Sequence, residues 1–173
     1  MIDTPQLRLR RCRPADADAV FAYRSRADVA AHLSAGAWTR EHTVRELAAY
    51  ESAPFDGPGD ELVLLAETRD DASVVGEVGL VWLAEPDGVA EIGYVFNPEF
   101  GGRGFATEAV SAVIRWALDE RDFSRVTAVT DAANTASRAL CDRVGMSLVT
   151  TSRSTDGRGV VECTYAIGGL APA

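Results

Sequence analysis

Hydrophobic and polar residues follow one strand pattern and then three helical patterns in the first 52 positions. Residues 6–12 (QLRLRRC) alternate apolar and charged side chains, which predicts a half-exposed β-strand. Residues 14–25 predict a helix with a proline in its first turn, and a short helical stretch is expected around residues 28–33. A third helix is predicted over residues 40–52, with Thr39 as its N-cap. The apolar side chains expected on one face of this helix are Val44, Leu47 and Ala48.

The middle of the chain is predicted to be β-structure. Three runs rich in β-branched and aromatic residues are joined by turns with the sequences RDDA and EPDG. These runs are residues 61–68, 73–84 and 89–96. We therefore expect three successive strands here.

The rest of the chain alternates between helices and strands. The predicted elements are a helix from residue 105, a strand at 125–131, a helix at 134–145, and strands at 147–154 and 160–167 around the turn TDGRG. Asn134 is the expected N-cap of the second helix, and Gly145 is its expected C′ residue. This order of elements predicts a mixed sheet with helices on its faces, which is an α/β or α+β sandwich. No linker divides the chain, so a single domain over residues 1–173 is expected.

Composition and charge exclude several classes of protein. The hydrophobic fraction of 47% and the charged fraction of 25% are typical of a globular domain. No apolar run approaches the roughly 18 residues of a membrane span, and no signal peptide is visible. Three scattered cysteines argue against a disulfide framework or a zinc site and favour a reducing cytoplasm. A net charge of −9 makes general nucleic-acid binding unexpected, and the absence of lysine excludes Schiff-base chemistry.

A glycine-rich turn precedes the helix that begins near residue 105. Gly101, Gly102 and Gly104 leave the backbone bare where free N–H groups and the helix macrodipole attract an anion, and Arg103 adds a positive charge. A P-loop is excluded because no lysine follows the last glycine, and a dinucleotide fingerprint fails because Thr107 stands at its final position. From the loop alone, a plain strand-to-helix turn remains the alternative.

Two stretches carry a resemblance to a known family. AEIGYVFNPEFGGRGFATEAVSAVIRWAL, followed by VTAVTDAANTASRALCDRVGM, resembles the GNAT superfamily of acetyl-coenzyme A-dependent N-acetyltransferases. The branch that it resembles is the RimJ/RimL-like one, whose best-known members acetylate the N-terminal alanine or serine of ribosomal proteins. The resemblance implies a mixed, mostly antiparallel sheet of six or seven strands flanked by helices. It also implies acetyl-CoA as co-substrate.

The resemblance assigns the glycine-rich turn to the pyrophosphate of acetyl-CoA. The family pattern Gln/Arg-x-x-Gly-x-Gly/Ala falls on residues 101–106, with glycine in place of the first Gln or Arg. The preceding strand is expected to pair with the pantetheine arm as an extra strand would, and to supply an N–H group for the oxyanion. The residues implied in acetyl-CoA binding are Tyr94, Val95, Phe96, Gly101, Gly102, Arg103, Gly104, Phe105, Ala106, Thr107, Asn134 and Ser137.

Transfer of acetyl to an amine requires a base and a proton donor for the departing thiolate. Glu91 and Glu77 are the candidate bases, and Glu91 is preferred because it lies on the strand that carries the acetyl group. Ser137 is the expected thiolate partner, and Cys141, four residues later on the same helix face, is a second donor. Many family members use a tyrosine at the position of Cys141, and no tyrosine is expected near it here.

The acceptor amine is the least specified part of the reaction. His32, Trp38 and His42 fall in the region that shapes the acceptor pocket in this family. A protein or peptide N-terminus is the preferred acceptor, with antibiotics, polyamines and amino-acid derivatives as alternatives. A non-catalytic acyl-CoA-binding domain is the alternative from another class. No metal, membrane or nucleic-acid partner is expected, and the branch leaves room for a homodimer.

Overall fold

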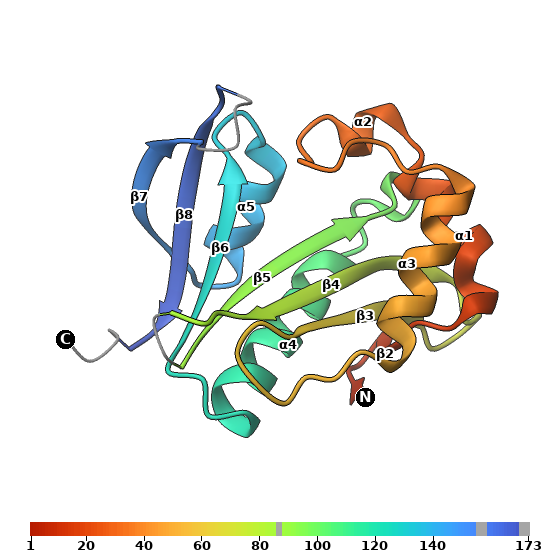
Figure 1. The fold of residues 1–173 in the computed structure, drawn as a ribbon, viewed down its shortest axis with the longest axis horizontal. Coiled ribbons are helices and arrows are strands. Elements are labelled where there is room, and N and C mark those ends of the chain that lie inside the picture. The colour runs from red at the N-terminus through yellow and green to blue at the C-terminus, as the bar shows by residue number, and fades with distance from the viewer. Residues whose placement is uncertain (86–87, 155–158, 170–173) are drawn as a thin grey trace.

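A computed structural model describes residues 1–85, 88–154 and 159–169, whose strands form one twisted sheet with helices on both faces (Figure 1). The strands are β1 (Ile2–Asp3), β2 (Leu7–Arg11), β3 (Glu61–Thr68), β4 (Val74–Trp82), β5 (Val89–Phe96), β6 (Arg125–Asp131), β7 (Ser147–Arg153) and β8 (Val161–Gly168). They are ordered β1-β2-β3-β4-β5-β6-β8-β7. Among these described strands, every neighbouring pair is antiparallel except β5–β6.

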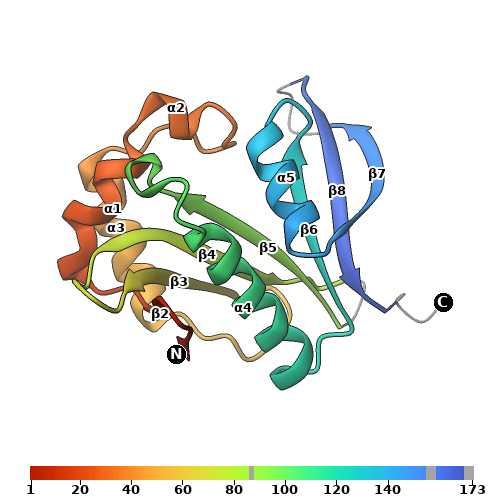
Figure 2. The ribbon, with the colours of Figure 1, turned by 180° about the vertical axis from the view of Figure 1, so that it is seen from behind.

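Helices cover the sheet unevenly. They are α1 (Ala17–Arg24), α2 (Ala27–Ala30), α3 (Arg40–Ser52), α4 (Phe105–Glu120) and α5 (Thr135–Arg143), with 3-10 turns η1 (Pro14–Asp16) and η2 (Pro98–Phe100). Helices α4 and α5 lie on one side, which we call the α4 face, and α1 and α3 lie on the other, which we call the α3 face (Figures 1 and 2). The larger hydrophobic cluster packs α4 against the sheet, and a smaller one packs α1 and α3 against β3 and β5.

The sequence predicted the elements more accurately than their faces. All seven predicted strands are confirmed, and the two-residue β1 is additional. Parts of the predicted turns EPDG and TDGRG, at residues 86–87 and 155–158, lie outside the described residues. The predicted face of α3 is wrong for Val44, which is 46% exposed, and for Ala48, which is also exposed, because the helix instead buries Thr43 beside Leu47. Thr43 tolerates burial because its hydroxyl donates to the carbonyl oxygen of Thr39 at 3.0 Å.

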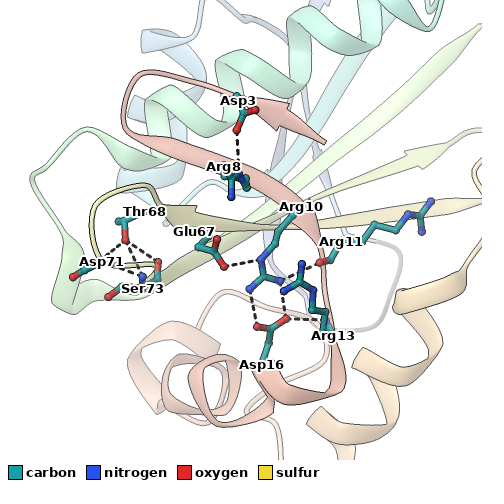
Figure 3. Close-up of polar contacts among 10 residues, drawn as sticks. All are labelled: Asp3, Arg8, Arg10, Arg11, Arg13, Asp16, Glu67, Thr68, Asp71 and Ser73. Atoms are coloured by element: carbon teal, nitrogen blue, oxygen red, sulfur yellow. Dashed lines mark hydrogen bonds and ion pairs between the residues drawn. The ribbon is translucent and has the colours of Figure 1, made fainter.

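A buried ion cluster ties β2 to η1, the turn that precedes α1 (Figure 3). Arg10, only 5% exposed, donates through both terminal nitrogens to the carboxylate of Asp16 at 2.8 Å and through Nε to Glu67 at 2.7 Å. Asp16 also accepts the backbone N–H of Arg13 at 2.7 Å. Because each buried charge has several partners, the cluster holds β2, η1 and β3 together without an uncompensated charge.

The sheet divides between β5 and β6. Parallel pairing joins only Val89–Glu91 to Arg125–Thr127. Beyond Glu91, β5 continues along β4 as far as Phe96, whereas β6 continues along β8 as far as Asp131. The two strands therefore diverge, as Figure 1 shows, and no other described strand pairs with the carboxyl-terminal half of β5 on that edge.

Candidate active site

The glycine-rich turn presents a bare backbone at the start of α4. Gly104 is the N-cap of α4 with φ +82°, and Gly102 has φ +76°, so both occupy the left-handed region that favours glycine. No heavy atom lies within 4 Å of the place where a Cβ would project at either residue. Gly101 differs, because its φ of −60° suits any residue, but a Cβ would approach the carbonyl oxygen of Pro98 to 3.0 Å. A side chain at this position would therefore require the turn at Pro98 to shift by a few tenths of an ångström.

A cavity of about 440 Å³ lies over this turn. It is lined by Val75, Phe96, Asn97, Phe100, Gly101, Gly102, Gly104, Phe105, Ala106, Thr107 and Arg143. Arg143, at the end of α5, donates through Nε to the hydroxyl of Thr107 at 3.3 Å, and the guanidinium of Arg103 lies 4.6 Å from the centre of the Phe105 ring. Sequence reasoning missed Arg143, because its place beside the turn follows from the packing of α5 against α4. Arg103 does not line the cavity itself, whereas Arg143 does. Free amides with Arg143 in the lining and Arg103 beside Phe105 suit a pyrophosphate.

A second cavity, also of about 440 Å³, extends from this turn along the gap between β5 and α5. It shares Phe96, Ala106 and Arg143 with the first cavity and reaches Asn134 and Ser137. We call it the β5–α5 groove. As predicted, Asn134 caps α5, since its side chain accepts the backbone N–H of Ser137 at 3.0 Å. The groove leads from the anion site to the side chains expected to act on the thiolate.

A tyrosine hydroxyl lies at the far end of the β5–α5 groove. The hydroxyl of Tyr94 is 2.9 Å from Oγ of Ser137 and 3.3 Å from Sγ of Cys141. The expectation that no tyrosine lies near Cys141 is therefore wrong, because the phenol arrives from β5 and not from α5. Burial, together with the contact to Cys141, raises the pKa of Tyr94, and burial also raises the pKa of the Cys141 thiol. Both groups stay protonated at neutral pH.

A third cavity, of about 450 Å³, adjoins the groove and contains the preferred base. We call it the acceptor cavity; its lining includes His32 and the carboxyl groups of Glu91, Asp131 and Glu162, and it shares Tyr94 and Ser137 with the groove. Burial, and then the negative charge of Glu162, raise the pKa of Glu91. Nδ1 of His32 lies 3.3 Å from the carboxylate of Asp131. Sequence reasoning did not single out Asp131 or Glu162, since only the pairing of β6 with β8 brings them to this place.

The other sequence candidates lie away from these three cavities. Glu77 is 4% exposed, accepts the hydroxyl of Tyr23 at 2.6 Å and is ion-paired with Arg24. Trp38 lies under the guanidinium of Arg24, 4.3 Å from it, and packs edge-on against His42. None of Glu77, Trp38 and His42 lines the cavities described above, whereas His32 lines two of them.

Within residues 1–85, 88–154 and 159–169, no cluster of three or more histidine, cysteine, aspartate or glutamate side chains is arranged to hold a metal ion. In the same part of the chain, no helix combines the length and apolar character needed to span a membrane.

Comparison with known proteins assigns the family. A family model described as an acetyltransferase (GNAT) domain matches residues 6–147. The chain is 29% identical over 146 residues to the uncharacterized N-acetyltransferase YoaA of Bacillus subtilis, covering 84% of this chain and 81% of that protein.

Solved structures agree with this assignment. A GNAT-family acetyltransferase from Bacillus anthracis superimposes with a TM-score of 0.86 at 25% identity, covering 96% of this chain and 97% of that one. RimL, a ribosomal L7/L12 α-N-protein acetyltransferase solved with coenzyme A, has the same fold, with a TM-score of 0.79 at 16% identity and 95% of each chain covered. The chain thus belongs to the GNAT family of N-acetyltransferases, with acetyl-CoA as its co-substrate.

Proposed function

We propose that this enzyme acetylates the α-amine at the N-terminus of a protein or peptide, in the manner of the RimJ/RimL-like branch. The amine attacks the thioester directly, with Glu91 as base and Ser137 as the group that donates to the departing thiolate. We further propose that it acts in the cytoplasm, where its three free cysteines would stay reduced.

The observation that carries the choice of acceptor is the open surroundings of the acceptor cavity. Val129, which lines this cavity, is 43% exposed, and all seven residues of the nearby edge strand β7 are exposed. In Figure 1, none of the described helices covers β6, β8 and β7 on the α3 face. A chain that continues beyond the reacting amine therefore has room to leave the cavity along this surface. RimL, which shares the fold, is named for the same type of acceptor.

Acetyl-CoA, the acetyl donor, would be bound along the first two cavities. The amides at the start of α4, with Arg103 and Arg143, would bind the pyrophosphate, and the β5–α5 groove would take the pantetheine arm. Successive amides of a strand point to opposite edges. The amide of Asn97 donates to Val75 on β4, so those of Tyr94 and Phe96 face the opening left by β6. They are therefore placed to pair with the arm and to bind the oxyanion.

As a base, Glu91 is better matched to an α-amine acceptor than to a lysine side chain as acceptor. An α-amine with pKa near 8 costs about 1.4 kcal/mol to deprotonate at pH 7, whereas an amine with pKa near 10.4 costs about 4.6 kcal/mol. Burial raises the pKa of Glu91, which makes its carboxylate a stronger base than an exposed one. Acting through one water molecule, such a carboxylate is a strong enough base to deprotonate an α-amine.

A panel of acceptors tests the proposal. Peptides beginning with alanine or serine would be incubated with acetyl-CoA beside their N-terminally blocked versions, polyamines and aminoglycosides, with thiol release and product mass as readouts. Acetylation of the free N-termini, with the blocked peptides unchanged, is the expected result. Modification of small amines with peptides ignored would replace the proposal by a small-molecule acetyltransferase.

The non-catalytic alternative makes a different prediction in the same panel. An acyl-CoA-binding domain would bind acetyl-CoA tightly but turn over no amine, and Glu91→Gln and Ser137→Ala would change nothing. Any acceptor that the wild-type enzyme acetylates, and that either variant acetylates more slowly, removes this alternative.

A further inference from the structure

We propose that Tyr94 is a positioning residue for acetyl transfer, whose phenol hydroxyl aims the hydroxyl of Ser137 at the departing sulfur of coenzyme A. The inference rests on the role proposed above for Ser137. The sequence resemblance implied only backbone contacts for Tyr94, so its side chain has no assigned part in the reaction.

Tyr94 bridges the opening where the sheet divides. It lies three residues beyond the last pair that β5 makes with β6, on the edge that has lost its partner strand. Its hydroxyl lies 2.9 Å from Oγ of Ser137 and 3.3 Å from the carbonyl oxygen of that residue, both on α5. Sγ of Cys141, one turn further along α5, is 3.3 Å away. The phenol thus joins the two walls of the gap at one point.

That point is where the two substrates would meet. Both Tyr94 and Ser137 line the β5–α5 groove, which continues to the glycine-rich turn through Ala106 and Arg143. The same two residues line the acceptor cavity, which contains Glu91. A thioester arriving along the groove and an amine held in the acceptor cavity would meet where the two cavities adjoin, and this pair of hydroxyls lies there.

The proposal assigns the donor and the acceptor in the contact between Tyr94 and Ser137. Burial keeps the Tyr94 phenol protonated, and its single proton can go either to the carbonyl oxygen of Ser137 at 3.3 Å or to Oγ of Ser137 at 2.9 Å. In the proposed arrangement the phenol donates to the nearer Oγ and its own oxygen accepts from the Cys141 thiol. Oγ of Ser137 is then occupied as an acceptor, and its proton is left to point into the groove. Without the phenol, a helical serine turns its hydroxyl toward the carbonyl oxygen one turn earlier, away from the groove.

The orientation of the Ser137 hydroxyl matters when the C–S bond of the thioester breaks. When the amine nitrogen bonds to the acetyl carbon and the C–S bond breaks, the electron pair of that bond goes to sulfur. The sulfur takes the Ser137 hydroxyl proton, Ser137 regains a proton from solvent, and Glu91 releases to solvent the proton it took from the amine. Tyr94 keeps its own proton throughout, so its contribution is to the orientation and polarisation of Ser137.

A double-mutant cycle tests this role with the best acceptor from the amine panel. We expect Ser137→Ala to lower kcat about 100-fold and Tyr94→Phe about 10- to 50-fold, with KM for acetyl-CoA within about threefold of wild type in both. The double variant should be no slower than Ser137→Ala alone, because Tyr94 acts through Ser137. Tyr165→Phe is the matched control, since it also removes a tyrosine hydroxyl that contacts α5, through Arg138 at 3.3 Å, and should keep its kcat within about twofold.

Several results would overturn the inference. Losses that multiply in the double variant, an unchanged kcat in Tyr94→Phe, or a loss confined to acetyl-CoA binding would each show that the phenol does not act through Ser137. Equal losses in Tyr94→Phe and Tyr165→Phe would show a structural effect on α5. An acceptor other than a peptide would contradict the proposed substrate but leave this cycle intact, so the two failures are distinguishable.

Discussion

Replacing Gly104 by alanine tests the bare backbone at the start of α4. At φ +82°, an alanine is strained by about 1–2 kcal/mol, which for a domain of this size lowers the melting temperature by roughly 2–8 °C. The added methyl group would project into the cavity where phosphate oxygens are proposed to meet the free amides. Loss of one charge-assisted hydrogen bond, about 2 kcal/mol, would weaken coenzyme A binding about 30-fold.

Thermal melts with and without ligand measure both effects. At about 100 times its dissociation constant, coenzyme A should add about 2.7 kcal/mol to the stability of the wild-type enzyme, a rise of roughly 5–10 °C. With 30-fold weaker binding, the same concentration adds only about 0.9 kcal/mol, a rise of roughly 2–4 °C.

Gly59→Ala is the matched control for this prediction. Gly59 has φ +94° and open space where its Cβ would lie, but it does not line any of the three cavities. The unliganded control should lose a similar amount of stability and retain the full rise with coenzyme A. A full rise in Gly104→Ala as well would refute the assignment of this turn to the pyrophosphate.

Two further predictions follow from charged groups. Glu91→Gln should lower kcat about 100-fold or more. Because burial raises the folded-state pKa of Glu91, its ionisation costs stability as pH rises through that value, so the same variant should melt higher than wild type at pH 7 but not at pH 4. Asp16→Asn should cost about 3 kcal/mol at pH 7, because it leaves Arg10 buried with one carboxylate fewer. Burial alone would raise the pKa of Asp16, but hydrogen bonds from Arg10 and Arg13 lower it. The difference in melting temperature between variant and wild type should therefore vanish as pH falls below the ordinary carboxyl range. Equal melting temperatures at pH 7 would contradict this reasoning.

Much of the fold could be predicted from the sequence, because it depends on local interactions. The caps at Thr39 and Asn134 are side-chain bonds to amides three residues ahead, so the residue types and their spacing are sufficient to predict them. The strands from residue 61 to residue 96 follow from runs rich in β-branched and aromatic residues joined by turn sequences, and their observed bounds match within two residues. The face of α3 was harder, because a threonine bonded to the preceding turn can be buried as readily as a valine.

The residues of the candidate site also fall into two groups: those predictable from local sequence and those placed by tertiary packing. The amino-acid sequence determines the glycines, the helix that follows them and the serine one turn inside α5, because these depend on contacts within a few residues and on backbone conformation. The position of the Tyr94 hydroxyl 2.9 Å from Ser137, across 43 residues of chain, depends on where β5 leaves β6 and on how α5 packs beside the gap. The same holds for Arg143 at the turn and for Asp131 and Glu162 beside Glu91. Strand order and the divergence of two strands arise from the packing of the whole chain, and no local pattern encodes them.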